Sequence, residues 1–181
     1  MVEQDEQPFQ ANLDKIPTLR PAFAKDGTIT AANASSISDG ASALVLTRRD
    51  EAERRGLAVK ARILGHSTHS QHPSEFTLAP IGAIDSLMKR LEWTTEDVDL
   101  FEINEAFAVV TLLAMDAHDI PHDKVNVFGG ACAQGHPVGS TGSRIIVTLI
   151  NALERRGKKR GIAALCIGGG EATAIAVELE G

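Results

Sequence analysis

Aromatic residues are nearly missing from this sequence. It contains no tyrosine, and six phenylalanines and one tryptophan make up only 4% of its 181 residues. Proteins that bind single-stranded nucleic acid usually stack bases on exposed aromatic rings, and a surface for polyanions needs clustered lysine and arginine. The formal net charge is −6. We therefore expect no nucleic-acid partner, and a core built from alanine, valine, isoleucine and leucine.

Cysteines and long apolar runs are also scarce. Two cysteines make no disulfide framework, and neither lies at metal-ligand spacing, so we expect free thiols. No run approaches the ~18 to 20 apolar residues of a membrane span. The N-terminus is acidic where a signal peptide would be basic. These absences predict a cytoplasmic protein without a membrane partner.

A metal site is not expected either. The one candidate set, His66, His69 and His72, falls in a segment rich in serine, threonine and glutamine. In an extended chain residues 66 and 72 share one face, whereas residue 69 points to the other. Because the ligands of a zinc ion must converge on it, we interpret these as surface histidines in a solvated loop.

The remaining composition, with 43% hydrophobic residues, is typical of one globular domain with extensions. Residues 1–28 are polar and interrupted by prolines, which predicts an arm. Short apolar runs then predict strands, and apolar spacings of three and four predict helices, in the order β-α-β-α-β-α-β-α-β-β. A short loop makes the last two strands adjacent and antiparallel, in an α/β fold with a mixed sheet. The expected strands are 43–47, 59–65, 99–103, 125–127, 162–167 and 173–178, and the expected helices are 50–55, 80–91, 106–117 and 145–153.

Two glycine-rich loops near the C-terminus each carry one reactive side chain. The first covers residues 129–142 and contains His136, and the second runs from Cys166 to Gly170. Glycine lets the backbone approach a ligand closely and leaves amides free as donors. The first loop is not a P-loop, because His136 and Pro137 occupy the positions where a P-loop requires lysine and serine or threonine. Its glycines also lack the G-x-G-x-x-G spacing of dinucleotide-binding loops. ATP and NAD are therefore disfavoured.

Asn104, His136 and Cys166 all follow predicted strands, and α/β proteins bind ligands where strands end and helices begin. Amides of the glycines after Cys166 can stabilise a thiolate, and a neutral His136 can exchange protons or donate to an oxyanion. The residues alone leave open that Cys166 is a small buried apolar residue and that His136 is a turn residue. We interpret Cys132 as a packing residue, because no acid or base lies beside it in the sequence.

Three motifs occupy these strand ends in order: Asn104-Glu105-Ala106-Phe107, Gly135-His136-Pro137 and Cys166-Ile167-Gly168-Gly169-Gly170. Together with Asn33-Ala34-Ser35 and Asp39-Gly40-Ala41, they resemble the C-terminal half of a thiolase. The resemblance covers nearly the whole chain and implies a thiolase-like α/β fold, with a mixed five-stranded sheet and helices on both faces. It also implies that residues 1–36 are an arm like the end of the thiolase loop domain, and that residues 37–181 are the C-terminal domain.

The resemblance implies a CoA-dependent acyltransferase of the acetyl-CoA acetyltransferase type, which condenses two acyl-CoA molecules or cleaves a 3-oxoacyl-CoA with CoA. By this resemblance Cys166 is the general acid/base. His136 would activate the acyl-accepting nucleophile and donate into an oxyanion hole, assisted by a water held on Asn104. The N–H of Gly168 would serve a second oxyanion hole, and coenzyme A enters as a substrate with no separate cofactor. The residues expected to line the pantetheine channel are Ser35, Ala106 and Phe107.

The chain departs from the family in its extent. A thiolase carries its acylated cysteine in a homologous N-terminal half, and Cys132 does not match that position, so we expect no turnover from this polypeptide alone. The expected partners are acyl-CoA or CoA, and either an N-terminal thiolase half or a second copy in a homo-oligomer. The alternative interpretation is a non-catalytic acyl-CoA-binding or interaction module derived from a thiolase.

Overall fold

The computed structural model describes residues 3–5, 7, 9 and 11–180 and centres on a mixed four-stranded sheet. The strand order is β1-β4-β3-β2, in which β2 runs parallel to β3 and the other two pairs are antiparallel. The predicted antiparallel pairing of the last two strands is thus confirmed. The strands are β1 (Ala61–Ser70), β2 (Leu100–Ile103), β3 (Arg160–Ile167) and β4 (Glu171–Leu179).

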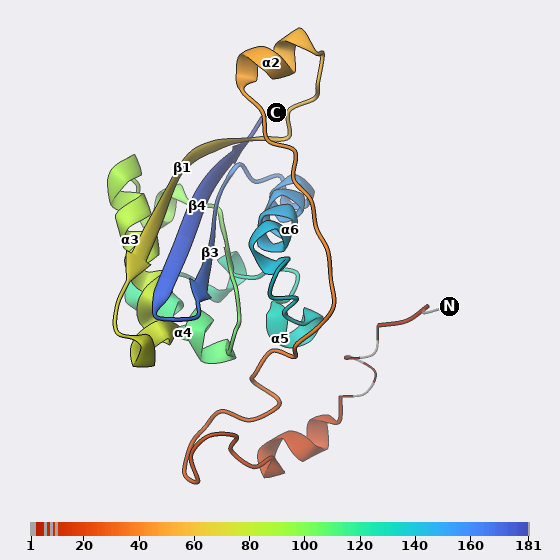
Figure 1. The fold of residues 1–181 in the computed structure, drawn as a ribbon, viewed down its shortest axis with the longest axis vertical. Helices are drawn as coiled ribbons and strands as arrows, with labels where there is room; N and C mark the ends of the chain where they lie inside the picture. The colour runs from red at the N-terminus through yellow and green to blue at the C-terminus, as the bar shows by residue number, and fades with distance from the viewer. Residues whose placement is uncertain (1–2, 6, 8, 10, 181) are drawn as a thin grey trace.

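Helices cover both faces of this sheet, as expected (Figure 1). One face carries α3 and α4, and the opposite face carries α6; α2 stands apart from the sheet near its far end. The α-helices are α2 (Arg49–Arg54), α3 (Ala79–Leu91), α4 (Ala108–His118), α5 (Ala131–Gln134) and α6 (Thr141–Arg156). The 3₁₀ helices are η1 (Leu13–Thr18), η2 (Pro73–Leu78), η3 (Thr95–Asp97) and η4 (His122–Lys124).

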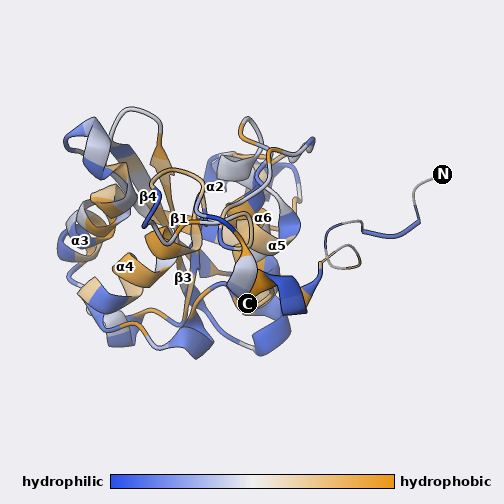
Figure 2. Ribbon diagram, turned by 90° about the horizontal axis from the view of Figure 1, so that it is seen from below, coloured by the Kyte–Doolittle hydropathy of each residue, from blue (hydrophilic) through white to orange (hydrophobic). Residues whose placement is uncertain are grey.

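Alternating side chains along β3 build a separate core on each face of the sheet. Ile162 and Ala164 belong to the core formed with α3 and α4, whereas Ala163 belongs to the core formed with α6. Neighbouring residues of a strand face opposite sides, so a strand of almost uninterrupted apolar residues serves both layers. Figure 2 shows the apolar residues gathered where these helices meet the strands.

A cluster of basic residues, 155–160, spans the end of α6 and the start of β3. Gly157 follows the helix with a left-handed φ of 60°. The N–H of Lys158 then donates to the carbonyl of Leu153 at 2.9 Å, which closes the last turn. Arg155 and Arg156 lie in that turn, where the helix dipole favours cations.

Two predicted strands do not form. Residues 43–47 have no strand structure, and Val45 and Leu46 are 92% and 67% exposed. Residues 125–127 contribute only an isolated bridge between Val125 and Phe101. An apolar run becomes a strand only when a neighbouring strand pairs with its backbone, and the described residues provide none for 43–47. Of the six predicted strands, four therefore form among the described residues, and the sheet has four strands where the resemblance implied five.

β1 is longer than predicted, and it includes His66 and His69, which were expected in a loop. The ring of His69 bonds the side chain of Gln71 at 3.2 Å. Among the described residues, no group of three or more His, Cys, Asp or Glu side chains is placed to hold a metal ion. Within the same residues, every helix is too short or too polar to cross a membrane.

The N-terminal arm, here continued as far as Ser38, passes the carboxyl edge of the sheet, where β2 and β3 both end. Ala34 forms a bridge with Phe107, and Ile37 forms a bridge with His136. The chain then runs beside α6 towards α2 (Figure 1). The arm therefore contributes directly to the edge that holds the predicted site residues.

Candidate active site

Asn104 lies directly after β2 and is tied to the neighbouring strand. Its N–H donates to the carbonyl of Ala164 on β3, with N and O 2.9 Å apart, and only 1% of the residue is exposed. Its Oδ1 accepts from Nη2 of Arg144 at 3.2 Å, and its Nδ2 lies 3.5 Å from Nε2 of His136. The structure thus brings Asn104 and His136 into contact at the carboxyl edge of the sheet.

His136 is held by its own loop and by the arm. The preceding Gly135 has a φ of 86°, and a Cβ at that position would collide with Oγ of Ser38. The N–H of His136 donates to the carbonyl of Ser36 at 2.9 Å. On the ring, Nδ1 lies 2.7 Å from Oγ1 of Thr141 at the start of α6. Glycine is therefore required at residue 135 both for its backbone conformation and for the close approach of the arm.

Cys166 lies near the end of β3, on the strand beside Asn104. It is two residues beyond Ala164, which corresponds to about 7 Å at the usual rise of a strand. The residue is 9% exposed. Within the described part of the chain, its thiol makes no hydrogen bond to Asn104 or His136. Gly168 follows in the exposed turn to β4, and open space lies where its Cβ would be.

The two reactive groups, His136 and Cys166, are both uncharged at rest. Burial first, and the nearby Arg144 charge second, lower the pKa of His136, so the imidazole is neutral at neutral pH. Burial raises the pKa of the Cys166 thiol, only partly opposed by a backbone hydrogen bond. The sequence suggested that amides would stabilise a thiolate at Cys166. In the structure desolvation outweighs that effect, so the resting group is a thiol.

The residues predicted to line a pantetheine channel lie together next to this site. Both the N–H and Oγ of Ser35 donate to the carbonyl of Ala106, at 3.3 and 3.0 Å. The ring of Phe107 packs edge-on against Phe23, with ring centroids 5.7 Å apart. The contact between arm and strand end is thus built by these residues, and their role in ligand binding stays a prediction.

Two family models match successive parts of this chain. The thiolase C-terminal domain matches residues 57–179, and the thiolase N-terminal domain matches residues 1–50. This chain belongs to the thiolase family. The division into an arm of residues 1–36 and a domain of residues 37–181 stays a prediction.

Individual thiolase relatives cover nearly all of the chain. The cytosolic acetyl-CoA acetyltransferase of Mus musculus is 48% identical over 98% of this chain and 45% of its own length. The crystal structure of the Bacillus anthracis acetyl-CoA acetyltransferase matches with a TM-score of 0.90 and 44% identity, over 92% of this chain and 42% of that one. Acat5 thiolase from Ascaris suum, solved in complex with coenzyme A, matches with a TM-score of 0.89 and 40% identity, over 99% and 47%. This chain spans somewhat less than half the length of these relatives.

The sequence reasoning missed two ionisable residues next to Asn104. Glu102 on β2 is 2% exposed, and its Oε1 lies 3.6 Å from Nη1 of Arg144 on α6. Burial raises the pKa of Glu102 to about 8, with Arg144 opposing the shift and Glu105 adding to it. The signal was available: a glutamate inside an apolar strand and an arginine in the first turn of an amphipathic helix need partners if they are buried.

Glu105 and Asn126 fasten the first glycine-rich loop to β2. Glu105 accepts hydrogen bonds from the N–H of Cys132 at 3.0 Å and from Nδ2 of Asn126 at 3.2 Å. Asn126 accepts from the N–H of Ile103 and donates to its carbonyl, each at 2.8 Å. Burial and the Glu105 carboxylate raise the pKa of Cys132 to about 12, which supports its interpretation as a packing residue.

Proposed function

We propose that these residues supply the acid/base and oxyanion side of a thiolase active centre, for Claisen condensation of two acyl-CoA molecules or thiolysis of a 3-oxoacyl-CoA. The observation that carries the proposal is the contact between Asn104 and His136 at the carboxyl edge of β2, one strand away from Cys166. A neutral imidazole, a fixed amide and a buried thiol in this arrangement can move protons and stabilise negative charge that develops on oxygen.

In the condensation direction, Cys166 acts as a thiolate and removes the α-proton of acetyl-CoA. The burial that raises its pKa makes this thiolate a stronger base. The enolate carbon forms a bond to an acyl carbon held as a thioester on a partner cysteine. As the carbon–sulfur bond breaks, His136 returns to that cysteine the proton it took when the acyl group was loaded. Cys166 gives its proton to the CoA thiolate released in that loading step, so protons balance over one turnover.

The oxyanions of this reaction need donors. His136, with a water held on Asn104, would form one oxyanion hole. The N–H of Gly168 would contribute to a second oxyanion hole, and the space left by the described residues in front of this glycine is consistent with that role.

Coenzyme A is proposed as a substrate, either free or carrying the acyl group as a thioester, and no separate cofactor is proposed. The proposal is supported by the coenzyme A complex of the Ascaris suum relative and by the clustering of the candidate channel residues Ser35, Ala106 and Phe107. One relative is named a cytosolic enzyme, and we extend the proposal to a cytoplasmic location.

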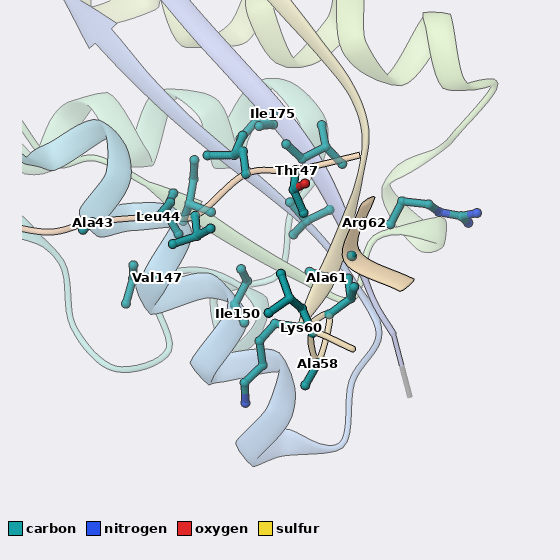
Figure 3. A pocket seen from close by; sticks show the side chains of 18 of the residues that line it. Ala43, Leu44, Thr47, Ala58, Lys60, Ala61, Arg62, Val147, Ile150 and Ile175 are labelled. Carbon is teal, nitrogen blue, oxygen red and sulfur yellow. The ribbon is translucent and has the colours of Figure 1, made fainter. Parts of the chain in front are cut away.

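The nucleophilic cysteine is proposed to come from an N-terminal thiolase half, whether that half lies on the same polypeptide or on another one. An apolar groove of about 840 Å³ lies between residues 43–47, the start of β1 and α6. Figure 3 shows Leu44, Ile150 and Ile175 lining this groove from three different elements. Residues 43–47 fall within the match to the thiolase N-terminal domain, so a larger part of that domain is the proposed cover for them.

Complementation tests this function. The 181-residue chain would be mixed with the N-terminal half of the Bacillus anthracis relative, and thiolysis of acetoacetyl-CoA would be followed after addition of CoA. We expect turnover from the mixture and none from either half alone. If the halves associate in sedimentation experiments and bind CoA but catalyse no thiolysis, the non-catalytic binding module is the better account.

A further inference from the structure

The side-chain amide of Asn104 is held between a guanidinium and an imidazole, and the guanidinium decides its orientation. Arginine has five N–H donors and no acceptor. The atom of Asn104 that lies 3.2 Å from Nη2 of Arg144 must therefore be Oδ1. The opposite orientation would place two donors against each other. It follows that Nδ2, a donor, faces Nε2 of His136 at 3.5 Å.

The other ring nitrogen of His136 agrees with this orientation. Its Nδ1 lies 2.7 Å from Oγ1 of Thr141, a residue that is completely buried. The Thr141 hydroxyl donates its single hydrogen to the carbonyl of Pro137 at 3.0 Å. Its oxygen is then left to accept from Nδ1–H of His136. Both neighbours of the ring thus favour a proton on Nδ1 and a lone pair on Nε2.

We propose that Arg144 is a positioning residue which, acting through Asn104, holds neutral His136 in the tautomer with its proton on Nδ1 and its Nε2 lone pair facing the site. The importance of this tautomer for catalysis rests on the proposed function, since Nε2 is the atom that would accept the nucleophile's proton. The tautomer itself is a property of this chain and is measurable without turnover.

Arg144 occupies its position at an electrostatic cost. Its side chain is 16% exposed, and its Nε and Nη1 have no hydrogen-bond partner among the described residues. The charged and titratable groups around it are Glu102 on β2, Glu105 after β2 and His136 itself. An apolar side chain of similar length would pack at this position without that cost. The guanidinium contributes the contact with Glu102 and the donor to Asn104, and the second of these bears on His136.

Imidazole nitrogen spectra of histidine-labelled protein test the proposal. The ¹⁵N shifts of His136, assigned by the loss of its signals in His136→Gln, would be recorded across pH. In the wild-type chain we expect, for neutral His136, a pyridine-like Nε2 and a pyrrole-like Nδ1. In Arg144→Met the amide is free to turn, so both nitrogens should move towards intermediate shifts, and the pKa of His136 should rise because a nearby cation is lost. Arg155→Met, an exposed position on the same helix, is the matched control and should change neither.

A second variant keeps the test decisive if Arg144→Met does not fold. Asn104→Asp retains an acceptor for Arg144 but presents another acceptor to Nε2, so the neutral ring should switch to the Nε2–H tautomer. A pyrrole-like Nε2 in the wild-type chain would overturn the proposal. So would unchanged ¹⁵N shifts in a folded Arg144→Met or Asn104→Asp variant. If complementation fails while the ¹⁵N shifts of wild type and variants behave as expected, only the proposed function is contradicted.

Discussion

Two segments lie beside α6, and they are built in opposite ways. The carboxyl edge of the sheet consists of polar side chains, yet Asn104 is 1% exposed and its neighbours form a continuous set of hydrogen bonds. Residues 43–47 consist largely of apolar side chains, yet Val45 is 92% exposed. Polarity therefore does not decide which segment is buried. A polar group is buried where partners satisfy it, and an apolar group is exposed where no layer of the described chain covers it.

This difference separates two kinds of functional surface. The carboxyl edge is organised within the described residues, because Asn104 and His136 contact each other and each finds a further partner on α6. The groove beside residues 43–47 is left uncovered by the described part of the chain. Substitutions in each of the two surfaces test that distinction, beginning with the one that should have the largest effect.

Replacing Cys166 should have the largest effect. In the complementation mixture, Cys166→Ala should lower the rate of acetoacetyl-CoA thiolysis by about 10² to 10⁴-fold, because a general acid/base is lost. Cys132→Ala is the matched control and should retain the activity, since that thiol packs against Glu105. Equal losses in the two variants would show that the assignment to Cys166 is wrong.

Replacing one buried apolar residue of α6 and one exposed apolar residue of segment 43–47 should have different effects on the free energy of unfolding. Leu149 is 1% exposed and packs in the core, so Leu149→Ala should lower the free energy of unfolding by about 2 to 5 kcal/mol. Val45→Asp should change it by less than about 0.5 kcal/mol in the isolated chain but weaken association with the N-terminal half. Urea unfolding and sedimentation measure the two effects. A large loss of stability in Val45→Asp would contradict the exposed position of this segment.

A substitution at Gly135 tests how closely the N-terminal segment packs against the carboxyl edge of the sheet. Gly135→Ala places a Cβ against Ser38 at a left-handed φ, so it should cost about 1 to 3 kcal/mol in the free energy of unfolding. Gly139→Ala is the control, because no atom of the described residues lies within 4 Å of its Cβ position. If the two variants lose similar amounts of free energy of unfolding, the loss at Gly135 does not come from the contact with Ser38.

The buried carboxyl of Glu102 should make stability depend on pH. Its pKa is raised to about 8 from 4.5, so the folded chain keeps a proton that the unfolded chain releases. This contribution to stability is complete below about pH 4.5 and is lost as the pH rises to about 8. Glutamine mimics the protonated form, so Glu102→Gln should gain stability relative to wild type over that range in urea unfolding. A difference that stays constant with pH would contradict the raised pKa.

The sequence predicted the helices and the paired strands well, because their signals are local. The apolar positions of α3 follow directly from helical spacing. It failed for residues 43–47, because an apolar run shows that a segment can be buried but not whether anything covers it. It also missed Glu102 and Arg144, which lie 42 positions apart and become partners only when α6 packs on β2.

By itself the sequence determined the order of the four strands that form and of the helices α2, α3, α4 and α6, the glycine-rich loops, and the placement of Asn104 and Cys166 at strand ends. These features depend on residues close together along the chain, and on motifs that resemble one family. The strand predicted before His136 does not form, and His136 follows α5 instead. Only the tertiary structure decided that Asn104 touches His136, that Arg144 orients the amide between them, and that Cys166 rests as a thiol. Hydrogen-bond direction and desolvation depend on which distant segments pack together, so they arise only when the sheet, α6 and the arm are assembled.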